Sequence, residues 1–365
     1  MLKKFDIYII KKFLTTFFFM LGIIMLLAMV FDISEKLSEL IGNKAPVKAI
    51  IFDYYLNFLV FYGNTFSSMI IFVSVIWFTA KMAQDSEIIP MMFSGRPFTR
   101  IMRPYMIAAT FLMLISLILN HFIVPLSNQK RLDFEERFYR DRIYVENFHA
   151  EFPGNQYVYF DNYASDNGVV YGLKIENWSK DGKVVSYLSA TSATNKPGTK
   201  KWTINDYYVR KIHSNGDKNE AIQDLIIAGD KKDTSFQFQI EELAIRDNRS
   251  ETMSYSELKE FIAKEKAKGS GSVPMYEIEL YRRTSYPFAT YVLTLIGVAV
   301  SSKKTRGGIG ANIAVGLGFV FIYIFAMKVT TVAAINVGLS TQLAVWIPNI
   351  LFGIVGLYLY KIAPK

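Results

Sequence analysis

Six blocks of apolar residues constrain the fold of this chain more than any other feature. A helix needs about 20 consecutive apolar residues to cross a bilayer, and several of the blocks reach that length. With 51% hydrophobic and 15% aromatic residues, the 365-residue chain is too apolar for an ordinary soluble protein of this size. The sequence therefore predicts an α-helical membrane protein with six spans. They are expected at 13–31, 54–80, 105–126, 287–301, 309–333 and 343–360.

The distribution of charge separates a polar segment from the membrane part. This segment, at 127–282, carries 23 Lys and Arg against 25 Asp and Glu, whereas the rest of the chain carries 18 basic and 7 acidic residues. The formal net charge of +9 therefore resides entirely in the membrane part, which argues against a nucleic-acid partner. We predict three parts: spans one to three at 1–126, an outer domain at 127–282, and spans four to six at 283–365.

Basic residues gather on one side of the predicted membrane. Loops rich in Lys and Arg remain cytoplasmic, and 13 of the 18 bases of the membrane part lie on the side of the two termini. We expect both termini in the cytoplasm and the polar segment outside. The first block is about 19 residues long without a cleavage site after it, which favours a retained span over a signal peptide. The 13 bases are Lys3, Lys4, Lys11, Lys12, Lys81, Arg96, Arg100, Arg103, Lys303, Lys304, Arg306, Lys361 and Lys365.

The polar segment has the pattern of an all-β domain. Short stretches rich in Val, Ile, Tyr and Thr alternate with turn residues, which predicts an antiparallel sandwich or barrel. A helix should follow at about 254–268, with Ser254 and Glu257 as a capping box and Gly269 at its end; it either braces the sheet or moves. The chain has no cysteine to cross-link this domain. Strands are expected at 156–160, 168–178, 183–190, 201–212 and 234–240, with hairpin turns at 179–183 and 214–218.

Catalytic signatures are absent from the sequence. The three histidines, His121, His149 and His213, lack metal-ligand spacing. No GxxxxGK[ST] motif is present, so the chain has no P-loop for a nucleotide. We expect a non-catalytic protein without a cofactor or metal of its own. Any energy for transport has to come from a partner.

Two lysines and one small-residue stripe stand out in the membrane part. Lys328 is the only charge deep in an apolar block, near its outer end, where it either contacts a ligand or snorkels to the surface. Lys36 follows the first span and is either a lipid-phosphate contact or a solvated loop residue. Gly310, Ala314 and Gly318 recur every four residues, which allows a close helix contact, within the chain or with another subunit.

The loop between spans two and three predicts a short cytoplasmic helix at about 86–95. Asp85 or Ser86 can cap its start and Gly95 can end it, while Pro90 is tolerable only in the first turn. This helix either lies on the bilayer, with Arg96, Arg100 and Arg103 against lipid phosphates, or docks a cytoplasmic motor. The candidate docking residues are Glu87, Ile88, Met91, Met92, Phe93, Gly95 and Arg96.

Four segments resemble the lipopolysaccharide-export permeases of the LptF/LptG type. "SEIIPMMFSG" followed by "TRI" is similar to the family's SE-x-x-x-M-x-x-SG segment. "FDIYIIKKFLTTF", "MYEIELYRRTSYPFA" (275–289) and "GLGFVFIYIF" (316–325) resemble its N-terminus, its return to the membrane and its fifth span. The layout of three spans, outer domain and three spans also matches. The opening FD-x-Y and the GFVF in span five are closer to LptG than to LptF.

The resemblance implies a permease that extracts lipopolysaccharide from the inner membrane of a Gram-negative bacterium. It implies a dimer of the ATPase LptB that binds ATP and magnesium, and a second LptF/LptG-type permease that meets spans one and five. The outer domain is then a periplasmic jellyroll that hands lipid to LptC-type and LptA-type proteins. Glu87 matches the family's ATPase-coupling acid and Gly95 its helix stop. Pro90 departs from the family pattern, and Lys36 is only an approximate match for a basic residue of span one.

Two other classes compete with a transporter. A membrane-anchored lipid-binding scaffold has no motor, so a stable complex with an ATPase excludes it. A membrane transferase needs a polar catalytic cluster near the membrane surface, and the sequence shows none.

Overall fold

The structure, a computed structural model, divides into two compact units. A helical unit comprises the described parts of Met1–Tyr139, Ser250–Lys259 and Pro274–Lys365, and a sheet unit those of Arg140–Arg249 and Glu260–Val273. The structure describes residues 3–87, 97–138, 144–152, 154–164, 168–196, 199–212, 224–238, 247–302 and 308–363.

Six helical segments of the described chain are long and apolar enough to cross a membrane, as predicted. Most extend beyond their apolar blocks, because polar residues continue the helix after the hydrocarbon region ends. α6 (Phe98–Ile118) and α7 (Val124–Phe138) form one run, so helix continues 12 residues into the segment predicted as outer domain. The others are α1 (Lys4–Gly42), α4 (Ser67–Gln84), α10 (Val273–Ser301), α11 (Gly308–Asn336) and α12 (Thr341–Ile362).

The second span differs from its prediction. In place of one helix over 54–80, α2 (Val47–Ala49), a π-helix η1 (Ile50–Tyr55) and α3 (Leu56–Thr65) precede α4, and only α4 qualifies as a span. The helices break at Phe66, where the Ser67 hydroxyl donates to the carbonyl oxygen of Asn64 at 2.7 Å. Such a local side-chain bond offers the backbone an alternative to a continuous helix. Hydropathy alone does not reveal this break.

A π-helix, η2 (Leu119–Ile123), joins α6 to α7. Pro125 lies two residues after its end and has no N–H to donate to the preceding turn. A single π-turn accommodates this missing bond without ending the helix. The run Phe98–Phe138 therefore stays continuous.

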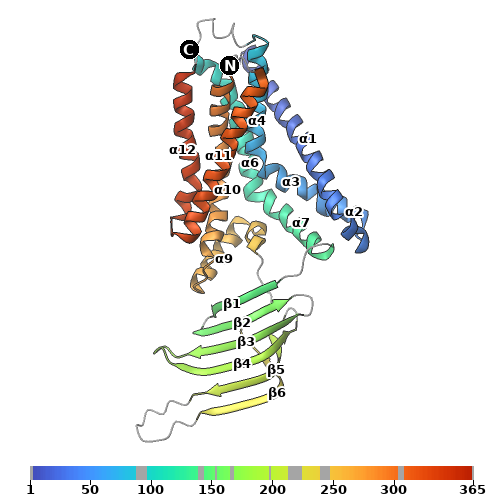
Figure 1. The fold of residues 1–365 in the computed structure, drawn as a ribbon, viewed down its shortest axis with the longest axis vertical. Helices are drawn as coiled ribbons and strands as arrows, with labels where there is room; N and C mark the ends of the chain where they lie inside the picture. The colour runs from blue at the N-terminus through green and yellow to red at the C-terminus, as the bar shows by residue number, and fades with distance from the viewer. Residues whose placement is uncertain are drawn as a thin grey trace. The chain divides into compact units, whose positions relative to one another are not determined.

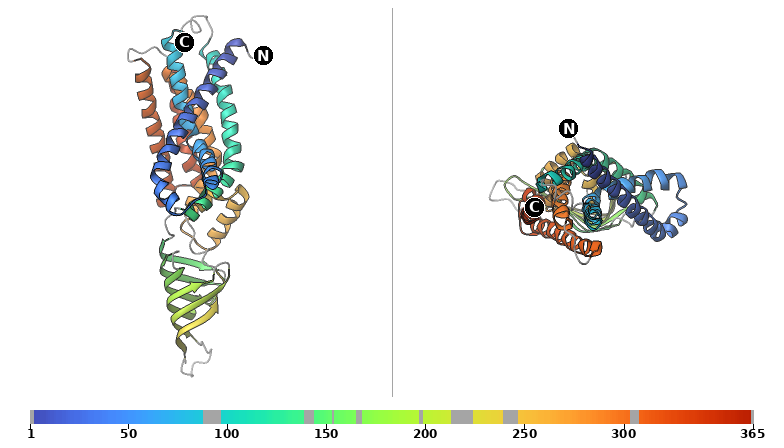
Figure 2. Two further views of the ribbon diagram at one scale, coloured as in Figure 1. Left: turned by 90° about the vertical axis from the view of Figure 1, so that its right-hand side faces the viewer. Right: turned by 90° about the horizontal axis from the view of Figure 1, so that it is seen from above.

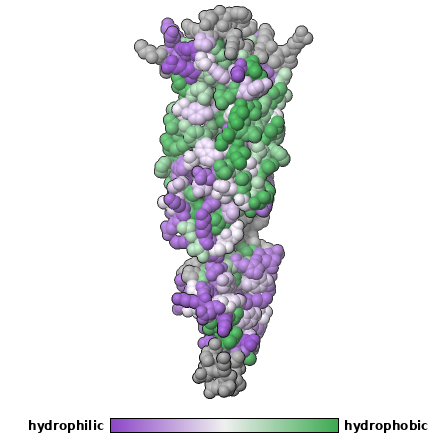
Figure 3. All heavy atoms as spheres, turned by 90° about the vertical axis from the view of Figure 1, so that its left-hand side faces the viewer, coloured by the Kyte–Doolittle hydropathy of each residue, from purple (hydrophilic) through white to green (hydrophobic). Residues whose placement is uncertain are grey.

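α4 lies in the middle of the helical unit, between α1 on one side and α11 on the other (Figures 1 and 2). The buried share of the most apolar stretch differs between the spans: it is 72% in α4 and 61% in α10, but only 17% in α1 and 22% in α11. The start of α1 and the end of α12 lie at the same end of the unit (Figure 1). The face drawn in Figure 3 carries a broad hydrophobic belt over this unit, as expected for spans in a bilayer.

The sheet unit holds one six-stranded antiparallel sheet with the strands in chain order (Figure 1). One face carries a core that includes Phe160, Leu173 and Trp202, and the indole of Trp202 donates to the carbonyl of Phe238 at 3.1 Å. The described strands form a meander, so the jellyroll remains an expectation. The strands are β1 (Tyr144–Phe152), β2 (Gln156–Ala164), β3 (Val169–Trp178), β4 (Val184–Asn195), β5 (Lys201–Lys211) and β6 (Leu225–Ser235).

Four of the predicted strands, β2 to β5, are confirmed. The strand expected at 234–240 is wrong over 236–238, which are not extended strand; β6 ends at Ser235, and 239–240 lie outside the described residues. β6 and β1 escaped prediction because they lie at the two edges of the sheet, where strands carry charged residues that imitate loops. The turn at 179–183 is confirmed by the Ser179 N–H, which donates to the Lys183 carbonyl at 2.8 Å; the one at 214–218 lies outside the described residues.

The predicted helix is α9 (Tyr255–Ala267), preceded by the 3-10 turn η3 (Asp247–Thr252). Its capping box is confirmed: the Ser254 N–H donates to the Glu257 carboxylate at 2.8 Å, and the Glu257 N–H donates to the Ser254 hydroxyl at 3.4 Å. Gly269 has the expected left-handed conformation, with φ of 69°. The ammonium of Lys268 lies 5.5 Å from the ring centre of Phe152 in β1. This contact favours the alternative in which the helix braces the sheet.

Candidate functional site

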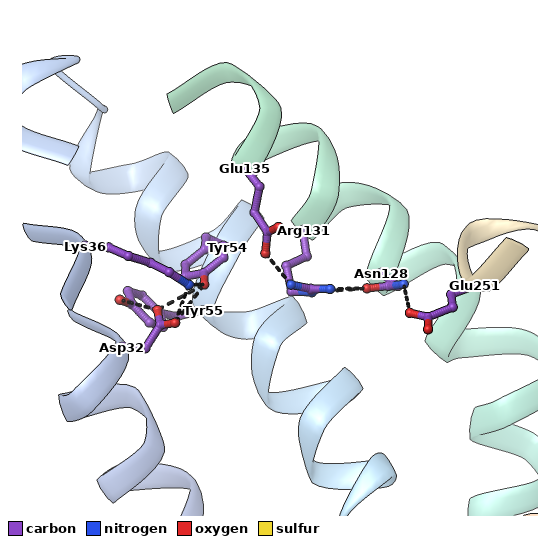
Figure 4. Close-up of polar contacts among 8 residues, drawn as sticks. All are labelled: Asp32, Lys36, Tyr54, Tyr55, Asn128, Arg131, Glu135 and Glu251. Carbon is purple, nitrogen blue, oxygen red and sulfur yellow. Dashed lines mark hydrogen bonds and ion pairs between the residues drawn. The ribbon is translucent and has the colours of Figure 1, made fainter. Parts of the chain in front are cut away.

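Lys36, one of the two candidate lipid contacts, lies in a polar cluster near the end of α1 (Figure 4). Its ammonium pairs with Asp32, one turn earlier, and donates to the Tyr54 hydroxyl at 2.7 Å. Tyr54 and Tyr55 of η1 in turn donate to Asp32 at 3.0 and 3.2 Å. The positive charge of Lys36 is therefore already neutralised within the chain. This cluster ties the end of α1 to η1.

A second cluster lies beside it, on α7 and η3 (Figure 4). Arg131 is buried, pairs with Glu135 one turn later, and donates twice to the Asn128 side-chain oxygen, at 3.1 and 2.7 Å. The side-chain amide of Asn128 in turn donates to the Glu251 carboxylate at 3.4 Å. The guanidinium also lies over the rings of Phe61 and Tyr62, at 4.8 and 5.3 Å from their centres. A buried charge needs this degree of pairing to be tolerated.

The electrostatics of Glu251 follow from its position. Burial raises the pKa of this carboxyl above its ordinary value, and the nearby Glu279 carboxylate raises it further. Arg283 of α10 holds the same region: it donates to the backbone carbonyls of Met253 and Ser250 at 2.8 and 2.9 Å. These groups dock η3 onto α10. Sequence reasoning missed Arg131 and Arg283, although Arg–Glu spacing of four residues was a signal for both.

Lys328, the other candidate, lies in a different environment. Its side chain is exposed on α11, and within the described residues it has neither an ion-pair nor a hydrogen-bond partner. At 100° per residue it shares one helix face with the exposed Phe321 and Phe325. Gly310 and Ala314 continue the same face toward the start of the helix. Lys328 therefore keeps the free charge that Lys36 has lost.

The two glycines of the predicted stripe, Gly310 and Gly318, make no close contact with the described residues. A Cβ added at Gly310 or Gly318 meets no atom within 4 Å. The close approach to α4 uses Gly316 instead, where an added Cβ would lie 2.2 Å from Ile76 Cδ1. Packing of the predicted stripe within the chain is therefore not seen, and its role at an interface with another subunit stays a prediction.

Of the candidate docking residues, only Glu87 belongs to the described part of the chain. Ile88, Met91, Met92, Phe93, Gly95 and Arg96 lie outside the described residues, as does Pro90.

The residues before this segment close α4. Ser86 is left-handed, with φ of 63°; its N–H donates to the Ala83 carbonyl, and the Glu87 N–H donates to the Met82 carbonyl at 2.8 Å. This pair of bonds is a Schellman motif, which ends a helix. Sequence reasoning missed it because glycine usually takes the left-handed position.

Glu87 itself is held by α1. Its Oε2 accepts a hydrogen bond from the Tyr8 hydroxyl at 2.8 Å and one from the Lys12 ammonium at 3.1 Å. Partial burial raises the pKa of Glu87, but these two bonds together with the charges of Lys12 and Lys81 outweigh it, so the pKa lies below its ordinary value. Arg100 is also engaged: it forms a bidentate pair with Asp6 of α1, at 2.5 and 2.7 Å. Arg100 is therefore already paired within the chain, which disfavours the alternative in which it faces lipid phosphates.

No group of three or more potential ligands in the described residues could hold a metal ion. His121 lies 3.2 Å from the Thr284 hydroxyl and links η2 to α10, while His149 lies beside Tyr159 in the sheet unit. The third histidine lies outside the described residues.

A protein-family comparison decides the identity. The model described as "Lipopolysaccharide export system permease LptF/LptG" matches residues 7–362, which is nearly the whole chain. The chain belongs to the LptF/LptG permease family. This permease is a transmembrane, non-catalytic subunit of a transporter that acts in lipopolysaccharide export. The match does not distinguish LptF from LptG, and no curated protein matches the sequence.

Proposed function

We propose that this permease extracts lipopolysaccharide from the inner membrane and passes it to a periplasmic bridge toward the outer membrane. The family match over residues 7–362 carries the proposal. A separate LptB-type ATPase dimer binds ATP and magnesium and supplies the energy. It docks on the cytoplasmic segment that begins at Glu87. Both termini are then cytoplasmic and the sheet unit periplasmic.

The open faces of two spans support a second permease and a lipid cavity. α1 and α11 are the least buried of the six candidate spans, although both are strongly apolar, with hydropathies of 2.5 and 2.1. They contact opposite sides of α4, so neither covers the other's apolar face within the chain. A second LptF/LptG-type permease that meets these faces encloses an apolar space between the two subunits. Acyl chains of the lipid fit that environment.

Lys328 is the residue we assign to the lipid phosphate. It is exposed on the same face of α11 as Phe321 and Phe325, and a cation beside an apolar surface suits an anionic lipid. Lys36 is assigned to hold the end of α1, since Asp32 and Tyr54 already bind its ammonium. The sheet unit then receives the lipid and hands it to LptC-type and LptA-type partners, with a jellyroll as its expected form.

Reconstitution tests this function. The chain is purified with the candidate ATPase and second permease and placed in proteoliposomes with lipopolysaccharide. ATP-dependent transfer of lipid to a soluble periplasmic acceptor is expected. Failure of any ATPase to co-purify favours the scaffold instead, whereas ATP hydrolysis by the complex without lipid transfer contradicts the transport role.

Two variants test the residue assignments in the same assay. Lys328→Gln should lower lipid transfer severalfold, whereas Lys48→Gln should not, because it removes an exposed charge from another part of the outer side. Glu87→Ala should uncouple ATP hydrolysis from transfer. Equal transfer by Lys328→Gln and the unmodified protein contradicts the phosphate assignment.

A further inference from the structure

The cytoplasmic end of α1 is fastened to two neighbouring helices by polar links. Glu87, just after α4, accepts hydrogen bonds from Tyr8 and Lys12 of α1. Arg100, in the first turn of α6, forms its bidentate pair with Asp6 of α1. All five groups lie within the first three turns of α1 or at the adjoining helix ends. Two separate links therefore hold one short stretch of α1.

Both links are geometrically well defined. The Schellman motif at Ser86 fixes the backbone of Glu87, because the Glu87 N–H is bonded to Met82 at 2.8 Å. Asp6 is 1% exposed, and its carboxylate also accepts the Lys3 N–H at 2.8 Å. A buried carboxylate that loses its bidentate partner is strongly destabilised, so the pair with Arg100 resists separation.

The two links flank the proposed motor-docking segment in the sequence. Glu87 directly precedes residues 88–96, and Arg100 follows them in the helix that begins at Phe98. A displacement of the docking segment therefore acts on α1 through a link at each end of that segment. Beyond the links, Ile9, Phe13 and Phe17 pack into the core shared with α4 and α6, which couples the motion to the helix body.

α1 is long enough to carry that motion across the membrane. Its 39 residues span about 58 Å as a straight helix. From Phe18 onward most of its apolar side chains are exposed, and the far part packs mainly through Met29 and Leu40 against the Tyr54 cluster. The far end carries the Asp32–Lys36–Tyr54 cluster (Figure 4). Movement at the fastened end is thereby delivered to the opposite side.

We propose that Tyr8, Lys12 and Asp6 form a clamp that transmits movement of the docking segment to α1, with Glu87 and Arg100 as its counterparts. These are positioning residues, and the inference rests on the proposed function, in which a motor acts on this segment. The Glu87 Oε1 accepts no hydrogen bond among the described residues, so the clamp and a motor contact use different oxygens. α1 is then driven directly by the motor, in addition to α4 and α6.

Neighbouring lysines provide a matched test in the full complex. Lys12→Met removes the ammonium that reaches Glu87, whereas Lys11→Met removes an equal charge from an exposed position one residue away. Because the Lys12–Glu87 pair is partly exposed, we expect a modest effect: about a threefold to fivefold loss of lipid transferred per ATP for Lys12→Met. ATPase binding and hydrolysis should be kept. Lys12→Arg should restore coupling, and Lys11→Met should not change it.

A distance measurement separates transmission from simple stability. The chain has no cysteine, so Phe31→Cys and Val337→Cys can carry the two spin labels, and both positions are exposed. Nucleotide binding should shift the distance between the labels, and Lys12→Met should reduce that shift while Lys11→Met leaves it intact.

Three outcomes overturn the clamp. They are full coupling in Lys12→Met, an equal loss in Lys11→Met, and loss of ATPase binding in Lys12→Met, which makes Lys12 a docking residue. Failure of the unmodified chain to bind an ATPase refutes the proposed function instead, and is seen before any variant is made.

Discussion

Removal of the Arg131 charge is expected to destabilise the helical unit strongly. Arg131→Met leaves the Glu135 carboxylate, whose side chain is 10% exposed, without its ion pair, and the Asn128 oxygen without two donors. Breaking one partner of a buried pair costs about 3–5 kcal/mol. For a unit of this size that corresponds to a fall in melting temperature on the order of 10 °C.

The double variant separates the pair from the cost of an orphaned charge. In Arg131→Met/Glu135→Leu no unpaired charge remains, and replacing a buried pair by apolar residues is often close to neutral. We expect its melting temperature to lie nearer to that of the unmodified protein than to that of Arg131→Met. Arg137→Met, at an exposed position on the same helix, should change little.

Thermal unfolding in detergent, followed by tryptophan fluorescence, measures all four proteins. A double variant less stable than Arg131→Met refutes the reasoning, because it means that the ion pair itself is strongly stabilising. An equally large loss in Arg137→Met points to a general effect of charge on α7.

Three further outcomes follow from local geometry. Gly316→Ala should cost about 1–3 kcal/mol of unfolding free energy, because its Cβ meets Ile76, and Ile76→Val should recover part of this loss. Gly318→Ala has free space for its Cβ and should not lower the melting temperature. A loss of export in Gly318→Leu without a fall in melting temperature then indicates contact with another subunit. Ser86→Gly should raise the unfolding free energy by about 0.5–1 kcal/mol, as it removes a left-handed non-glycine residue, and an unchanged melting curve contradicts this. The pKa of Glu251 in the fold lies above its ordinary 4.5, so the stability of the protein falls as pH rises from 4.5 through the raised pKa. Glu251→Gln should therefore stabilise the protein by an amount that grows with pH. A stability difference that does not depend on pH contradicts this prediction.

The spans, the inner strands and the α9 cap were predictable because each depends on local pattern. Apolar length places the spans, alternation places β2 to β5, and the Ser254–Glu257 spacing places the start of α9. The break at Phe66 was not predictable, since hydropathy remains high across it. The edge strand β6 was missed because its exposed charges imitate a loop.

Sequence pattern sufficed for the membrane class, the six spans and the separation of a β-rich segment, because these follow from transfer of side chains out of water along the chain. It also singled out Glu87, Lys36 and Lys328 as charges in unusual places. Their environments required the tertiary structure, since partners 18 to 79 residues apart decide them. Asp32 neutralises Lys36, and Tyr54 accepts a hydrogen bond from its ammonium. Tyr8 and Lys12 bind Glu87, and Lys328 remains free among the described residues. Charge in a sequence is local, but the pairing that sets its role is made between helices that only folding brings together.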